Sequence, residues 1–471
     1  MQLDQLPDDV LVTLMQHLDV DSLLACRLVC RRLCGLALHG DAWRHRWLWT
    51  DFEPRARAVL RLAPCLRGVS VCGHILPLIA TRCSVAHLLL TVNVSDQGDG
   101  AEARLALAAT QFALVVRNQE ALGRLRGVTL SCLYPMFGAE ALIMTLAATS
   151  GLESLRVVGI VPYHWSLIEQ GPRRPTLEHF ECELTTGTES FVNTVLAGHG
   201  DTLEVVDLGA HSRDGVEGYL GQTSETTLRL LGGMGRLREL TCQLLPGLEV
   251  VAACPTLENL RLNVYSFEPH AIEGACELLR RAHHLRSVCL DYYYDDSQDR
   301  PPEVGAKLIE ALGCCSSGRS LVTQLAISAL PLLQPLLGAL PSLPALHDLW
   351  LSAPLLTLNG ELAQGITPST APALRLLALR PYETLECVHD WLHTDTPKTV
   401  LTANPQLHIL VRELHECGIC EACELGCHRN VRWGVSKEVG LFVHDLGKCT
   451  SPEVHIVDHP WRSWIQVARC I

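Results

Sequence analysis

Aromatic side chains are scarce in this sequence, at 5% of 471 residues, whereas apolar residues make up 48%. The core must therefore be built mainly from leucine, valine and alanine, which favours many small repeated contacts over one large aromatic core. A basic segment followed by an apolar one is also missing at the N-terminus, where Met1 precedes Gln2, Leu3 and Asp4. We therefore expect no secretory leader, a cytoplasmic or nuclear location, and reduced thiols for the 21 cysteines.

An excess of positive charge is absent, since the net charge is −13. Residues 1–70 hold nine arginines and eight acidic residues and are nearly neutral, so the rest of the chain carries a net charge of about −14. A surface that binds nucleic acid needs clustered lysine and arginine, so we expect no nucleic-acid partner. The charge is compatible with a basic protein partner but does not identify one.

Charged residues are absent from Ser320–Leu346, a stretch long enough to cross a bilayer. Proline would break a spanning helix repeatedly there, so we expect buried repeat core and no membrane segment. The four prolines are Pro331, Pro335, Pro341 and Pro344.

Motifs for catalysis are also missing. The sequence has no glycine-rich phosphate loop with lysine, no G-x-S-x-G and no His-Glu-x-x-His. No acid–base partner can be assigned to a cysteine nucleophile either. We therefore expect a protein that is not itself an enzyme.

The first fifty residues show the pattern of several short helices. Pro7 suits a first helical position, and Asp8 and Asp9 complement the dipole of a first turn. Asp21 or Ser22 could cap a second helix, and a third would begin near Cys30. So short a segment cannot bury all of its apolar surface against itself, so part of that surface is expected to face a partner.

This stretch resembles an F-box, with one departure at Leu33, where the family usually carries tryptophan. The resemblance implies docking on the Skp-type adaptor of cullin–RING ubiquitin ligases. The alternative is an ordinary amphipathic bundle of helices. The residues predicted to form the adaptor surface are Leu6, Pro7, Leu11, Leu14, Leu23, Leu24, Val29 and Trp43.

A pattern of aliphatic residues at positions one, four and six recurs along the chain with a mean period of about 28 residues. Several repeats begin with leucine followed by a charged residue, as in Leu177-Glu178 and Leu285-Arg286. Helix-like stretches lie between them, at Ala101–Leu125, Ala139–Ala148, Ala271–Arg281 and Val304–Leu312. The pattern begins at Leu66, Val85, Leu125, Leu152, Leu177, Leu203, Leu237, Leu257, Leu285, Val322, Leu346 and Leu374.

One strand and one helix in every 20–40 residues is typical of a leucine-rich repeat solenoid. The chain resembles the F-box proteins that carry such repeats. The expected fold is α/β, with an N-terminal helical F-box followed by an irregular leucine-rich repeat solenoid (horseshoe) and a C-terminal capping segment. The expected boundaries are 1–50 for the F-box, 51–65 for a connector, 66–396 for the repeats and 397–471 for the cap. The rival fold is a general α/β array without a horseshoe.

Residues beyond 397 depart from the repeat. Val431–Val435 and Leu441–Val443 flank Ser436–Gly440, a pattern that indicates a hairpin. Because the last repeat of a solenoid would otherwise expose its core, we interpret this segment as a cap.

Four cysteines are concentrated in the C-terminal segment with the spacing C-x2-C-x2-C-x3-C. Thiolates so placed could converge on one soft ion, zinc or an iron–sulfur cluster, or they could be plain thiols. A single compact run lacks the second pair that would make a zinc site specific. The candidate ligands are Cys417, Cys420, Cys423, Cys427 and His428.

Aromatic and acidic residues follow the repeat that begins at Leu285. Tyrosine often anchors protein interfaces, so this segment is a candidate target-binding surface. The alternative is a solvated loop whose rings lean on the next repeat. The candidate residues are Tyr292, Tyr293, Tyr294 and Asp295.

Together, the resemblance implies a non-catalytic substrate-recognition subunit of an SCF-type ubiquitin ligase. The F-box would hold the Skp-type adaptor, and through it cullin and the RING protein, while the repeats hold an unknown target. Two alternatives remain open: a scaffold that engages the adaptor without delivering a target, and a receptor that senses metal through its cysteines.

Overall fold

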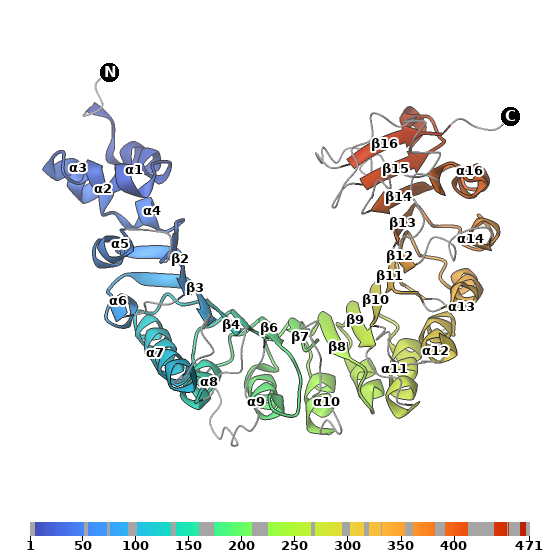
Figure 1. Cartoon of the computed structure of the whole chain (residues 1–471), viewed down its shortest axis with the longest axis horizontal. Helices are drawn as coiled ribbons and strands as arrows, with labels where there is room; N and C mark the ends of the chain where they lie inside the picture. The colour runs from blue at the N-terminus through green and yellow to red at the C-terminus, as the bar shows by residue number, and fades with distance from the viewer. Residues whose placement is uncertain are drawn as a thin grey trace. The chain divides into compact units, whose positions relative to one another are not determined.

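We analysed a computed structural model of the chain (Figure 1). It divides into two compact units, Met1–Leu237 and Arg238–Ile471, which are described in turn. Among the described residues, no helix is both long and apolar enough to cross a membrane. The structure describes residues 5–50, 55–72, 76–92, 101–132, 138–159, 174–209, 225–264, 269–293, 302–314, 320–330, 332–353, 361–381, 391–412, 438–449, 451 and 462–467.

The first unit opens with a helical module of α1 (Asp8–Gln16), α2 (Val20–Cys26), α3 (Arg31–Ala37) and α4 (Gly40–Trp43). Pro7, expected at the first helical position, lies one residue earlier, at the N-cap of α1. The cap of α2 differs from the prediction, because the carboxylate of Asp19 accepts the Ser22 N–H at 2.6 Å. Asp19 lies one position before the helix, where a side-chain acceptor reaches the unpaired amides of the first turn.

Leu11, Leu23 and Trp43 form the centre of this module, each at most 3% exposed. The indole N–H of Trp43 donates to the Ala37 carbonyl at 2.7 Å, which satisfies its one polar atom inside the core. Arg46 then joins the module to the first repeat. Its guanidinium donates to the carbonyls of Ala42 and Met15, while its own carbonyl accepts the amide of Arg67.

The sheet of the first unit runs in chain order, each strand parallel to the next, with the helices on one side of it (Figure 1). We call the opposite side the helix-free face. The strands are β1 (Trp47–Trp49), β2 (Cys65–Cys72), β3 (Ser84–Val92), β4 (Gly127–Cys132), β5 (Ser154–Gly159), β6 (His179–Cys182) and β7 (Val205–Asp207). The helices are α5 (Ala56–Leu62), α6 (Leu76–Ile79), α7 (Ala101–Ala121), α8 (Glu140–Ala148), α9 (Glu189–His199) and α10 (Glu225–Gly232).

The second unit repeats this arrangement and ends differently. Strands β8 to β14 are parallel neighbours, β15 is antiparallel to β14, and β16 is parallel to β15. Its strands are β8 (Glu239–Gln243), β9 (Asn259–Val264), β10 (Ser287–Tyr292), β11 (Gln324–Ser328), β12 (Asp348–Ala353), β13 (Leu376–Pro381), β14 (His408–Arg412), β15 (Glu438–Phe442) and β16 (Arg462–Gln466). Its helices are η2 (Leu248–Ala253), α11 (Pro269–Arg281), α12 (Pro302–Gly313), α13 (Leu333–Ala339), η3 (Leu340–Ser342), α14 (Glu361–Gly365), α16 (Asp395–Ala403) and η5 (Leu446–Lys448).

The predicted repeat positions are confirmed. All twelve aliphatic starts, from Leu66 to Leu374, are at most 5% exposed, and each lies at or just before a strand of β2 to β13. A main-chain pattern accompanies them, because two successive amides at a strand start donate to one carbonyl of the preceding repeat. For example, the Glu178 carbonyl accepts the N–H groups of Glu204 and Val205 at 2.9 and 3.0 Å. We call this contact the paired-amide clamp.

The structure differs from the sequence pattern at the ends of the repeats. The repeats extend beyond the expected limit at residue 396, because α16 leads into β14, which is parallel to β13. Val439 and Gly440, expected in a hairpin turn, lie instead in β15, which pairs with both β14 and β16. The expected connector 51–65 contains the helix α5. Residues 413–437, which include the first arm of the predicted hairpin at 431–435, lie outside the described residues.

Candidate functional site

Apolar side chains face outward on the N-terminal helical module. Leu14 is 48% exposed and lies one turn after Val10 on α1, at 39%, while Leu28 and Val29 follow α2 at 78% and 68%. Residues four apart on a helix lie on the same face. Exposed side chains of this size add little to the stability of the module itself, so they are suited to contact a partner. We call Val10, Leu14, Leu28 and Val29 the module's apolar surface.

The residues predicted to contact the adaptor fall into three groups in the structure. Leu14 and Val29 lie on the apolar surface, and Pro7 is also exposed. Leu6 and Leu24 are half-buried. Leu11, Leu23 and Trp43 are internal, so they stabilise the module and are not available to a partner.

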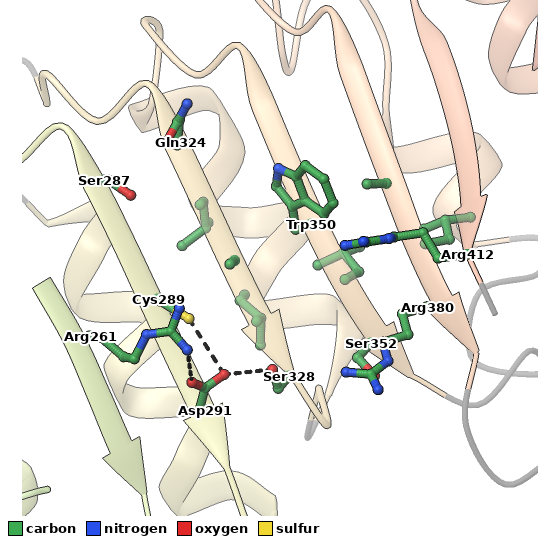
Figure 2. A pocket seen from close by; sticks show the side chains of 16 residues that line it. Arg261, Ser287, Cys289, Asp291, Gln324, Ser328, Trp350, Ser352, Arg380 and Arg412 are labelled. Carbon is green, nitrogen blue, oxygen red and sulfur yellow. Dashed lines mark hydrogen bonds and ion pairs between the residues drawn. The ribbon is translucent and has the colours of Figure 1, made fainter. Parts of the chain in front are cut away.

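A second candidate site lies on the helix-free face of the second unit, where a pocket of about 330 Å³ spans strands β9 to β14 (Figure 2). Side chains alternate along each strand, so every second residue points into it while the intervening leucines fill the core. This volume is at the lower end of the range for ligand pockets. The pocket is therefore large enough for one or two side chains of a bound peptide.

Trp350 lies in the middle of the pocket, flanked in register by Ala326 on β11 and Ala378 on β13. The two small neighbours leave the indole accessible from the sides. The Arg412 guanidinium lies 5.3 Å from the centre of the Trp350 ring and pairs with Glu438 at 2.7 Å. Because the Glu438 carboxylate is only 9% exposed, it holds Arg412 in this position over the aromatic ring.

A polar group forms another part of the pocket, centred on Asp291 (Figure 2). Its carboxylate accepts from Arg261 at 2.8 Å, from the Ser328 hydroxyl at 2.6 Å and from the Cys289 thiol at 3.4 Å. Burial, together with the nearby Asp291 carboxylate, raises the pKa of Cys289 to about 12, so this cysteine stays a neutral thiol. The group is thus a structural network and not a nucleophilic centre.

Positive charge exceeds negative charge in the pocket. Three of the lining residues are arginines, and one, Asp291, is acidic. In a chain with a net charge of −13, this is a local cationic surface. Ser352 faces Arg380 in register, so a hydroxyl donor adjoins a guanidinium on the neighbouring strand. The arrangement is suited to an oxyanion beside an apolar side chain.

The predicted tyrosine surface is divided by the structure. Tyr292 is 4% exposed, and its hydroxyl donates to the Gly305 carbonyl at 2.8 Å, so it packs inside the repeat. Tyr293 is 41% exposed. Tyr294 and Asp295 lie outside the described residues, as do Cys417, Cys420, Cys423, Cys427 and His428. A different set of possible metal ligands, His408, His444 and Cys449, comes together within the described part of the second unit.

Sequence reasoning missed both Leu28 and the pocket. Leu28 directly precedes Val29 in the motif, so its exposure follows only from where α2 ends. The pocket residues lie at corresponding positions of different repeats, as with Cys289, Ala326 and Trp350. Stacking the predicted strands by their leucine starts would have brought these residues together.

Comparison with protein families finds an F-box-like domain at residues 3–49. Comparison with curated proteins finds no match. Solved structures that match include the Rad7 and Elc1 complex in yeast, with TM-score 0.38, 13% identity, and coverage of 82% of this chain and 87% of the other. A TLR13–ssRNA13 complex matches with TM-score 0.34 and 13% identity, covering 79% of this chain and 49% of the other.

The F-box-like match covers the helical module and β1, the segment whose motif predicted it. The parallel strands, each beginning at a buried leucine or valine and most followed by a helix, form the leucine-rich architecture expected after it. The chain therefore carries an F-box-like domain at residues 3–49, followed by an α/β repeat array whose parallel strands begin at buried aliphatic residues.

Proposed function

We propose that this chain is a non-catalytic substrate-recognition subunit of an SCF-type ubiquitin ligase, acting in the cytoplasm or nucleus. The F-box-like domain would bind a Skp-type adaptor and through it cullin and a RING protein, while the helix-free face binds a target. The mechanism is proximity, since holding a lysine of the target near a charged conjugating enzyme raises its effective concentration. The observation that carries the proposal is the F-box-like domain with four apolar side chains turned outward.

The adaptor contact can be tested without disturbing the fold. Leu28 and Val29 are 78% and 68% exposed, so replacing both by serine removes apolar contact area and little core packing. Leu11, at 3% exposed, is a poor test because its truncation would leave a cavity. We expect L28S/V29S to weaken adaptor binding about tenfold or more, the effect of losing a central apolar contact.

The matched control is L107S/L114S on α7, where two leucines are 58% and 46% exposed away from the F-box-like domain. Binding of recombinant adaptor would be measured by calorimetry, with far-ultraviolet circular dichroism to check folding. The adaptor assignment is wrong if the control and L28S/V29S bind the adaptor equally well.

For the target, we propose a peptide segment with an oxyanion side chain next to an apolar one, bound in the pocket over β9–β14. Arg380 and Arg412 lie on neighbouring strands, which are about 4.8 Å apart in a sheet, so two guanidiniums can share one anion. Trp350 supplies the apolar contact between Ala326 and Ala378. The oxyanion is a carboxylate or a phosphate, and the experiment distinguishes these.

The experiment compares proteins captured from cells by the wild type, by R380E and by W350A, after proteasome inhibition. R380E is preferable to an Arg412 variant, because losing Arg412 would leave the Glu438 carboxylate, 9% exposed, without this partner. R281E, which reverses charge on α11 outside the pocket, is the matched control. If the pocket binds the target, one set of proteins is captured by the wild type and by R281E but not by R380E or W350A. All four proteins should still capture the adaptor.

Peptides from those proteins would then be compared with glutamate, phosphoserine or glutamine at the anionic position. If either the glutamate or the phosphoserine peptide binds tightly and the glutamine peptide does not bind, the tightly bound form identifies the oxyanion. Equal binding of the glutamine form would contradict the proposed chemistry. The scaffold function is favoured instead if the chain captures the adaptor but no ubiquitinated protein is lost when the pocket is mutated.

A further inference from the structure

Three side chains with metal-ligand atoms meet near the end of the second unit. His408 opens β14, His444 follows β15, and Cys449 follows η5, so separate stretches of chain supply them. One nitrogen from each histidine and the sulfur lie within 4.8 Å of one another. Both histidines are at most 1% exposed, an unusual environment for two imidazoles side by side.

Backbone carbonyls orient both imidazole rings. Nδ1 of His408 lies 3.0 Å from the Arg375 carbonyl, and Nδ1 of His444 lies 3.0 Å from the Pro405 carbonyl. A carbonyl oxygen only accepts, so Nδ1 is the donor in both contacts, and in the neutral tautomer that makes this bond the lone pair is on Nε2. A carbonyl partner on the outer nitrogen is the arrangement that fixes histidine tautomers in metal sites.

The sulfur is placed to join them. Cys449 Sγ lies 3.5 Å from Nε2 of His408 and accepts the amide of Ser451 at 3.4 Å. A thiol has one proton to donate, whereas a cation can be coordinated by the sulfur and both Nε2 atoms together.

Aromatic rings enclose the group. The rings of His408 and His444 meet edge to face at 4.8 Å, with Trp464 5.6 Å from His408 and Phe442 5.2 Å from His444. Gly440 permits this packing, because a Cβ there would lie 2.1 Å from the Trp464 ring. Residues from β14, β15 and β16 therefore build one apolar shell around three ligands.

We propose that His408, His444 and Cys449 bind one zinc ion that fastens the start of β14 to the segment that follows β15. Zinc is the ion whose usual ligands mix imidazole and thiolate, at about 2.0 Å from nitrogen and 2.3 Å from sulfur. Tetrahedral ligand atoms at these distances lie about 3.3–3.6 Å apart. The 3.5 Å between Cys449 Sγ and His408 Nε2 already fits this spacing, and the widest pair, within 4.8 Å, closes by about 1 Å on binding. The Cys449 proton leaves to solvent, the histidines bind neutral, and water completes the fourth position.

This site is distinct from the cluster Cys417–Cys427 predicted from the sequence, and the test must separate the two. One variant of the full-length chain replaces the four cluster cysteines by serine. A second, H408Q/C449S, removes two ligands of the site proposed here. A third, H347Q/C314S, replaces an exposed histidine and an exposed cysteine of the same unit as a matched control.

Each protein would be stripped with a chelator, reloaded with zinc against a chromophoric competitor, and analysed for metal by mass spectrometry. We expect H408Q/C449S to bind one equivalent fewer than the wild type and the control, and the cluster variant to keep this equivalent. Cobalt should give thiolate charge-transfer absorption in the cluster variant, and additional C449S should abolish it.

Thermal unfolding supplies a measurement that does not depend on H408Q/C449S being well folded. Zinc added to the stripped cluster variant should raise its melting temperature, because binding favours the folded state. The proposal is overturned if the stripped cluster variant binds no zinc, gives no cobalt–thiolate band and melts at the same temperature with and without zinc.

Discussion

His199 shows how a single buried side chain joins the end of a helix to the start of the preceding strand, β6. It is 4% exposed at the end of α9, and its Nδ1 accepts the amides of Thr176 and Leu177, both at 3.2 Å. Burial lowers the pKa of His199 from 6.5 to about 4. The protein therefore needs the neutral ring, since a proton on Nδ1 would remove both hydrogen bonds.

The sign of the pH effect follows from this shift. Above pH 6.5 both folded and unfolded forms are neutral, and stability is complete. Between pH 6.5 and about 4 the unfolded chain takes up the proton first, so folding weakens. We expect a loss of about 2 kcal/mol between pH 6.5 and 5, at ~1.4 kcal/mol per pH unit.

Urea unfolding of the wild type and of H199N measures this contribution. Asparagine can place an acceptor oxygen near the position of Nδ1 but does not titrate. We expect the variant to lose that part of the pH dependence. An unchanged slope of stability against pH in H199N would show that His199 does not titrate as described.

Gly159 gives a second prediction at the residue scale. It has φ +99° at the end of β5, and a Cβ would lie 1.8 Å from the Cys132 carbonyl oxygen on β4. Backbone cannot move aside cheaply, so we expect G159A to lower stability by about 2 kcal/mol or more. G35A in α3, where a Cβ meets nothing within 4 Å, should be neutral or stabilising in the same thermal assay.

Sequence reasoning at this scale succeeded where one physical rule decides. The aliphatic repeat starts are buried because a strand start facing the helices has nowhere else to place its side chain. It failed for Tyr292, where an aromatic next to acids resembles a surface but the hydroxyl finds an internal carbonyl. The exposure of a side chain depends on the residues of the neighbouring repeat, which lie far away in the sequence.

At the scale of elements, the same threonine pair recurs in both units. Thr185 and Thr188 exchange backbone-to-hydroxyl bonds at 2.9 and 3.2 Å, and the Thr188 hydroxyl donates to the Glu183 carbonyl at 2.6 Å. Thr367 and Thr370 show the same bonds, with Gly365 as acceptor. The pair forms a turn after a strand in one case and after a helix in the other.

We expect T188V to destabilise the first unit by about 1–2 kcal/mol, because valine keeps the shape but leaves buried amide and carbonyl groups without their bonds. T194V is the control on the following helix, where a half-buried hydroxyl bonds only to the carbonyl four residues earlier. Chemical unfolding would compare the two variants. Equal stability losses would show that the threonine pair has no special role.

Helices were predicted well where the helical spacing of apolar residues continues over many residues. The four helix-like stretches correspond to α7, α8, α11 and α12, with ends shifted by a few residues. The turn expected at Ser436–Gly440 was wrong from Glu438 onward, because glycine there admits the Trp464 ring within a strand. A glycine that makes room for a partner cannot be distinguished by sequence from one that bends the chain.

At the scale of the whole molecule, the sequence predicts that residues 66–396 form one solenoid without an internal boundary. The spacing from Leu203 to Leu237 and on to Leu257 continues across residue 237, where the two units are divided. Each repeat of a solenoid buries its leucines only against its neighbours, so a cut would expose core. We expect limited proteolysis to preserve the span from 66 to 396.

Denaturant unfolding of the intact chain and of any fragments completes this test. Rapid cleavage near residue 237 into two halves that each unfold cooperatively would contradict a single solenoid. The target could not be predicted at this scale, because the pocket is assembled from side chains of separate repeats and its specificity lies in their combination.

The paired-amide clamp has a consequence for how this family of repeats can diverge. The carbonyls of Arg126, Glu153 and Arg286 all serve as the double acceptor, so the identity of the side chain does not matter to the bond. The register between repeats is thus fixed by main-chain hydrogen bonds, and the only side chain this contact requires is the buried aliphatic residue beside it. Exposed side chains on the helix-free face take no part in this bond, so substitutions there can change what the surface recognises while the main-chain register is kept.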